Sequence, residues 1–138
     1  MSLEWQVQMS VGNDLIDSDH KYLIELINQI EESLGSMNRG QLAESLDGLS
    51  RYSLTHFALE EKIAGAVGYP DVSRLHESHE ELIGKLEQFR QELGSDWTTA
   101  AIRRFIALLR DWLINHVIKE DLRMKPFLAK RSPKFDPR

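Results

Sequence analysis

The sequence predicts an all-α protein, an up-and-down antiparallel four-helix bundle with an N-terminal arm. Apolar residues recur every three or four positions along four stretches, as they do on the buried face of a helix. Residues that favour turns gather between these stretches, at 35–40, 65–70 and 94–96. No stretch alternates polar and apolar residues as a half-buried strand would.

The four periodic stretches follow one another with short connections, which favours antiparallel neighbours. The first begins at about Asp17, where Asp17 or Ser18 could cap the helix, and carries Leu23 and Ile27 on its apolar face. The other three faces are formed by Leu42, Leu46, Leu49 and Ile63, by Leu75, Leu82, Leu86 and Leu93, and by Ile102, Phe105, Leu109 and Trp112.

Both ends of the chain differ from this pattern. The residues up to about Leu15 are mixed in character, and we expect them to form an arm anchored by Trp5. We therefore expect one bundle domain over residues 1–125. Residues 126–138 are rich in charge and proline, which predicts an exposed polar tail or linker.

Composition excludes several classes of function. A chain of 138 residues is long enough for one domain, and no apolar run approaches the roughly 18 residues that a membrane span needs. A net charge of -5 with dispersed basic residues argues against nucleic acid as a partner. The absence of cysteine excludes disulfides and thiolate metal sites, and no secretory signal pattern is present, so we expect a cytoplasmic protein.

Polar residues interrupt the apolar faces of all four predicted helices. They are His20, His56, Glu60, His79, His116 and Asp121. Any one of them could be a hydrogen-bonded core residue, but a buried carboxylate costs several kcal/mol unless it is paired or binds a cation. Imidazole suits iron, zinc, copper and nickel, and carboxylates can bridge two ions. Six such ligands exceed one tetrahedral zinc site, so they predict a centre of two metal ions.

The order and spacing of these residues resemble those of the bacterial hemerythrins. The resemblance runs from about Trp5 to Leu122 and rests on IDSDHK at 16–21, HFALEE at 56–61, the turn Tyr69-Pro70, His79-Glu80 and WLINH at 112–116 followed by Asp121. It implies two non-haem iron ions joined by an oxo or hydroxo bridge. It also implies that His20 and His56 bind one iron, that His79 and His116 bind the other, and that Glu60 and Asp121 bridge them.

The spacing between His116 and Asp121 does not fit a regular helix. Five residues place two side chains about 140° apart around an α-helix. We therefore expect a local widening or an end-of-helix distortion here, of the kind found in π-bulges.

One ligand position of the family is filled differently in this chain. The resemblance implies histidines five and nine residues after Pro70, and the chain has Leu75 and His79 there. His76 is adjacent but lies about 100° round the helix, so it would reach the centre only if the helix rotated; whether it replaces the missing ligand stays open. Without that ligand both irons would have an open position, and the centre should oxidise readily.

The resemblance implies a protein that binds or senses O2 or redox state, as a sensory module coupled to a signalling partner domain rather than an enzyme. The alternatives are a di-iron oxidase or peroxidase, an oxygen carrier or store, and a metal-free interaction bundle. The Glu-x-x-His element of ferritin-like oxidases is absent, which weighs against the enzyme. The ligand types do not separate iron from zinc or manganese.

Overall fold

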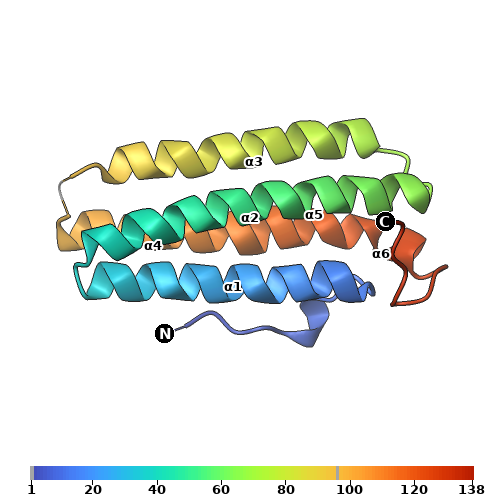
Figure 1. The fold of residues 1–138 in the computed structure, drawn as a ribbon, viewed down its shortest axis with the longest axis horizontal. Helices are drawn as coiled ribbons and strands as arrows, with labels where there is room; N and C mark the ends of the chain where they lie inside the picture. The colour runs from blue at the N-terminus through green and yellow to red at the C-terminus, as the bar shows by residue number, and fades with distance from the viewer. Residues whose placement is uncertain (1, 96) are drawn as a thin grey trace.

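The computed structural model describes residues 2–95 and 97–138 and contains four long helical rods packed side by side (Figure 1). The first three rods are α1 (Asp14–Gly35), α2 (Arg39–Ala66) and α3 (Val72–Leu93). The fourth is composite and comprises α4 (Thr99–Asp111), a π-helical segment (Trp112–Ile118) and α5 (Lys119–Asp121). The described residues contain no strand, and the predicted all-α bundle is confirmed.

The rods are arranged in a ring, in chain order. α1 contacts α2, α2 contacts α3, α3 contacts α4, and α4 returns to α1. Short connections join consecutive rods, so each runs antiparallel to the one before it (Figure 1). This arrangement directs one face of every rod toward a shared interior.

α1 begins three residues before the predicted start. Asn13 has an extended backbone, and its side-chain oxygen accepts hydrogen bonds from the backbone N–H groups of Leu15 and Ile16. Asp17, which we expected to cap the helix, lies in the first turn, where its carboxylate accepts from Ser10 Oγ and from the backbone N–H of Val11. The cap prediction was wrong because Asp17 fastens the arm instead.

The turn after α2 explains one of the predicted breaks. Gly68 adopts a φ of 77°, which glycine reaches without steric cost. The backbone N–H of Tyr69 then donates to Ala64 O over 2.9 Å, closing the helix end in the pattern typical of a left-handed cap. The break predicted at 94–96 includes residue 96, which lies outside the described residues.

The interior has two apolar clusters separated by a polar layer. The larger includes Leu23, Ile27, Leu49, Leu82, Leu109 and Trp112. The smaller consists of Val11, Ile16, Ile63, Ala64, Leu75, Met124 and Leu128. Along the chain, His20, His79 and Asp121 each lie between a residue of one cluster and a residue of the other, and with His56 and Glu60 they form the polar layer.

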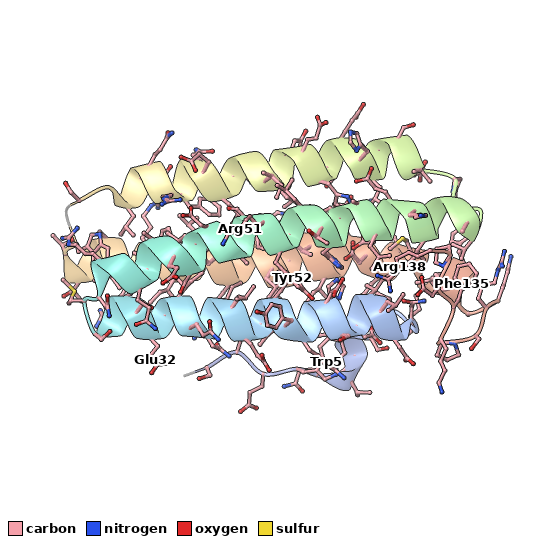
Figure 2. All side chains as sticks on the ribbon, in the orientation of Figure 1. Trp5, Glu32, Arg51, Tyr52, Phe135 and Arg138 are labelled. Atoms are coloured by element: carbon pink, nitrogen blue, oxygen red, sulfur yellow. The ribbon has the colours of Figure 1, made fainter. Side chains whose placement is uncertain are left out.

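The N-terminal arm packs as predicted. Trp5 is partly buried against the larger cluster, and the Lys21 amino group lies 5.1 Å from the centre of its ring (Figure 2). Leu3 and Asn28 exchange hydrogen bonds of 2.9 and 3.0 Å, which fix the arm along α1.

The C-terminal segment is not an exposed tail throughout. α6 (Lys125–Leu128) follows a short 3-10 helix, and Leu128 is buried in the smaller cluster. The backbone then returns to the start of α1, where Phe135 O accepts from Asn13 Nδ2 over 3.0 Å. Figure 2 shows Phe135 at this end of the bundle. Packing therefore continues past residue 126, where we expected a tail to begin.

None of the described helices combines the length and the apolar character that a membrane span requires.

The Asn13→Ala substitution should test how the two ends of the bundle are joined. Asn13 is buried and makes three hydrogen bonds, two to α1 and one to Phe135 O. We expect the free energy of unfolding to fall by about 1–2 kcal/mol, measured by urea denaturation. Asn38→Ala, at the exposed cap of α2, is the matched control, and an equal loss in both variants would contradict the role assigned to Asn13.

Candidate metal centre

Four of the predicted ligands meet inside the bundle. His20, His56, Glu60 and Asp121 each offer a donor atom, and these atoms lie within 4.8 Å of one another. All four side chains are at most 1% exposed. They come from α1, α2 and α5, so residues far apart in the sequence form one cluster.

Glu60 lies at the middle of the cluster and faces two histidines. Its Oε2 atom is 2.7 Å from His56 Nε2, and its Oε1 atom is 3.5 Å from His79 Nε2. Asp121 Oδ2 is 2.7 Å from His20 Nε2 and 3.6 Å from His56 Nε2. Each carboxylate therefore lies against two imidazoles, as a bridging ligand would.

His79 approaches from α3 and closes the cluster on that side. It is 4% exposed, and its ring stacks on Phe57 with a centroid distance of 4.0 Å and an interplanar angle of 6°. This stacking limits rotation of the ring, so its Nε2 atom stays directed toward Glu60.

Several buried polar atoms of this layer have no hydrogen-bond partner among the described residues. They are His20 Nδ1, Ser53 Oγ, His56 Nε2, both carboxylate oxygens of Glu60, and His79 Nε2. An unpaired buried polar group costs about 1–3 kcal/mol, and more when it is charged. Four of these atoms belong to three side chains that face one another, which indicates that they share a missing partner.

The electrostatics of the layer agree with a cationic partner. Burial, with the nearby Asp121 carboxylate, raises the pKa of Glu60. Burial opposes ionisation of His56, but the Glu60, Asp121 and Asp19 carboxylates outweigh it and hold the pKa of His56 well above 6.5. The protein alone must therefore keep protons among these groups, and a metal cation can replace them.

The π-helical segment turns Asp121 into the cluster. Trp112 and Asp121 are both buried, yet nine residues on a regular α-helix would place them about 180° apart. Within the segment the buried positions recur every five residues, at Trp112 and Val117 and at Leu113 and Ile118. The predicted widening is therefore confirmed, and it directs Asp121 inward.

The same segment leaves His116 outside the cluster. Its side chain is 44% exposed, and its Nε2 atom lies 3.1 Å from Asp111 Oδ2, five residues earlier. The π-winding aligns His116 with Asp111, five residues earlier, but it ends at Ile118, so it does not extend over the interval from His116 to Asp121. The structure thus contradicts the predicted placement of His116 at the centre.

The structure also shows where His76 and Leu75 lie relative to the cluster. His76 is 55% exposed and lies between Glu61 and Glu80, at 2.6 Å and 2.9 Å, so it does not reach the centre. Leu75 is 2% exposed and packs in the smaller apolar cluster. On α3, only His79 faces the polar layer.

Sequence reasoning missed three residues that surround the predicted ligands, two in direct contact with them and one through Asp19. Asp19 and Glu61 bind the second ring nitrogens of His56 and His79, and Tyr52 binds Asp19. The signal was present, because Asp19 and Glu61 are acidic residues directly adjacent to the predicted ligands His20 and Glu60.

The donor set fits metal ions that accept nitrogen and oxygen. Imidazole and carboxylate together suit iron, and also zinc or manganese. His20 and His56 with the two carboxylates could hold one ion, and His79 with the remaining carboxylate oxygens could contribute to a second. Such ions would satisfy the unpaired atoms of Glu60, His56 and His79 at once.

Comparisons with known proteins place the chain in a family of cation-binding domains. A family model described as "Hemerythrin HHE cation binding domain" matches residues 11–128. A bacteriohemerythrin of Pseudomonas aeruginosa is 31% identical over 120 residues, which cover 86% of this chain and 76% of the relative. That of Methylococcus capsulatus is 29% identical over 115 residues, covering 82% of this chain and 86% of the relative.

Solved structures show the same fold. A crystal structure of a hemerythrin mutant superposes with a TM-score of 0.78 over 94% of this chain and 99% of the other, at 23% sequence identity. A second hemerythrin mutant gives a TM-score of 0.76 over 92% of this chain.

Alanine substitutions should distinguish the two outer histidines. Since His79 faces Glu60 and His116 lies over Asp111, His79→Ala should weaken binding of Co²⁺, followed by its absorption bands, while His116→Ala should not. A loss of bound Co²⁺ in His116→Ala would contradict this and would mean that the π-helical segment rewinds when metal binds.

Proposed function

Because the chain belongs to the hemerythrin HHE cation binding domain family, we propose that it is a non-haem di-iron protein that binds or senses O2 or redox state. One observation carries the proposal: the two oxygens of the buried Glu60 face different histidines, His56 at 2.7 Å and His79 at 3.5 Å. A carboxylate placed in this way suits two cations better than one.

The two ions would be held unequally. His20 and His56 would bind one iron, with Glu60 and Asp121 as shared ligands. The other iron would have His79 as its only imidazole, because His76 and His116 bind surface carboxylates and Leu75 offers no donor. We therefore expect the second ion to bind more weakly and to keep positions for water or a small oxidant.

Bound iron supplies a reversible change of oxidation state and an open position for a diatomic ligand. The chain's own residues control access to it. Phe57 stacks on His79, and the apolar clusters on both sides of the layer exclude bulk water. In such surroundings, charge changes at the centre act on Asp121 and Glu60 with little screening.

A sensory role is supported by the position of Asp121 in the fourth rod. It lies three residues after the last residue of the π-helical segment, a rare form of winding that occurs frequently at functional sites. A change in its coordination would therefore act on the irregular part of the fourth rod and on α6, which follows Asp121 in the chain. A signalling partner domain, in the cytoplasm, would read this movement.

A di-iron oxidase or peroxidase is the second candidate. A hollow of about 500 Å³ opens beside His79, and its walls include Leu54, Phe57, Ile83 and Glu61. Such a hollow could admit a small organic substrate close to the less crowded metal position. An oxygen carrier or store is less well supported, because an open centre releases oxygen less cleanly than a closed one.

Metal analysis tests the proposal directly. Protein loaded with Fe²⁺ without oxygen and freed of excess metal should hold close to two ions per chain at saturation, in one tighter and one weaker step. Glu60→Gln should lose the weaker ion first, because the amide is a poor bridge. Glu87→Gln, on the exposed face of α3, is the control; wild-type protein that retains no iron would refute the proposal.

Leu75→His tests the effect of the open position. A histidine here would lie one turn from His79 on the same face of α3, where it could add a ligand to the second iron. We expect a slower oxidation of the reduced protein in air and a longer-lived oxygenated form, followed by visible absorption. A long-lived oxygenated form already present in the wild-type protein would favour the carrier over the sensor.

A further inference from the structure

The same local arrangement occurs twice around the centre. On α1, Asp19 precedes His20, and on α2, Glu61 follows Glu60. In each pair one residue faces the interior, and its neighbour, about 100° round the helix, points toward the next rod. There it meets a histidine of the centre from the opposite side.

Asp19 contacts His56 and Tyr52 with its two oxygens. Asp19 Oδ2 lies 2.9 Å from His56 Nδ1, and Asp19 Oδ1 accepts from the Tyr52 hydroxyl over 2.6 Å. Tyr52 is one turn before His56 on α2, where α1 and α2 lie side by side (Figure 2). Burial and the hydrogen bond to Asp19 raise the pKa of Tyr52, so its hydroxyl remains a donor.

Glu61 contacts His79 and His76 in the same way. Its Oε2 atom lies 3.0 Å from His79 Nδ1, and its Oε1 atom lies 2.6 Å from His76 Nδ1. Glu80 contacts the other nitrogen of His76 at 2.9 Å. Each of the two carboxylates is thus held by a second donor, a tyrosine in one case and a histidine in the other.

These contacts decide which ring nitrogen is available to a metal. An ionised carboxylate can only accept, so Nδ1 of His56 and of His79 must carry the hydrogen. A neutral imidazole then has its lone pair on Nε2, and both Nε2 atoms face Glu60 without a hydrogen-bond partner. His20 differs, since its Nδ1 is unpaired and buried.

We propose that Asp19 and Glu61 are positioning residues that hold the Nε2 atoms of His56 and His79 toward the metal centre and strengthen them as donors. The inference rests on the proposed function in naming metal as the partner of these atoms. Neither carboxylate belongs to the cluster that could bind the ion directly, and both are partly exposed, at 20% and 22%. They act through the histidines, as outer carboxylates do in many metal sites.

Substitutions at both positions test the assignment. Asp19→Ala and Glu61→Ala should each weaken Co²⁺ binding by about 10–100-fold, measured by competition with a chelator. Tyr52→Phe should have a smaller effect in the same direction, because Asp19 keeps its bond to His56. Asp47→Asn, which removes an exposed carboxylate paired with Arg90, is the control and should bind as the wild-type protein does.

A second measurement separates orientation from general stability. In the wild-type protein, the Nδ1–H of His56 should exchange slowly with water in nuclear magnetic resonance spectra, and Asp19→Ala should accelerate that exchange, with or without metal. Thermal unfolding of the metal-free variants should change much less than their affinity for Co²⁺. If the alanine variants do not fold, Asp19→Asn and Glu61→Gln replace them, with smaller expected losses.

The outcomes are distinct. Equal Co²⁺ affinity in Asp19→Ala, Glu61→Ala and wild-type protein would overturn the inference and leave the proposed function intact. The same loss in Asp47→Asn would also overturn it, because the effect would then be one of net charge. If the wild-type protein binds no metal, the proposed function fails, and the exchange rate of the His56 Nδ1–H alone decides whether Asp19 orients the ring.

Discussion

A carboxylate buried between helices constrains the whole of this bundle. Glu60 is completely inaccessible to solvent, and neither of its oxygens has a hydrogen-bond partner among the described residues. The desolvation of such a group costs several kcal/mol. The surrounding imidazoles of His56 and His79 offset this cost only when a cation or protons lie among them. The fold therefore holds a site that the protein alone cannot satisfy well.

The apolar clusters on both sides of the polar layer increase the cost of burying Glu60. Because the polar layer separates them, the rods pack tightly on both sides of the site, and water cannot relieve it from either end. The arm and the C-terminal segment extend the packing, with Trp5 along α1 and Phe135 against the start of the same helix. Stability from apolar contact thus supports a layer that is itself unfavourable.

Much of the fold and part of the site could be predicted from the sequence. Helical periodicity predicted the four rods, and polar residues on apolar faces predicted the convergence of His20, His56, Glu60 and Asp121, because burial restricts which side chains can point inward. The position of His116 could not be predicted in this way. Its environment depends on how a seven-residue segment is wound, and a periodicity of 3.6 residues assumes regular winding. The cap at Asn13 was missed for another reason: the side chain of Asp17 is equally suitable as a helix cap, and the sequence alone does not distinguish the two positions.

The π-helical segment of the fourth rod connects the part of that rod in the larger apolar cluster with the part in the smaller one. It sets the rotation of everything that follows it about the helix axis, including Asp121, Met124 and Leu128, which are all buried. Rewinding it as an ordinary α-helix to bring His116 inward would swing these three side chains out of the interior together. The packing of Met124 and Leu128 in the smaller cluster therefore fixes the rotation of this rod about its axis. His116 could replace Asp121 as the inward-facing residue only if both apolar side chains left that cluster.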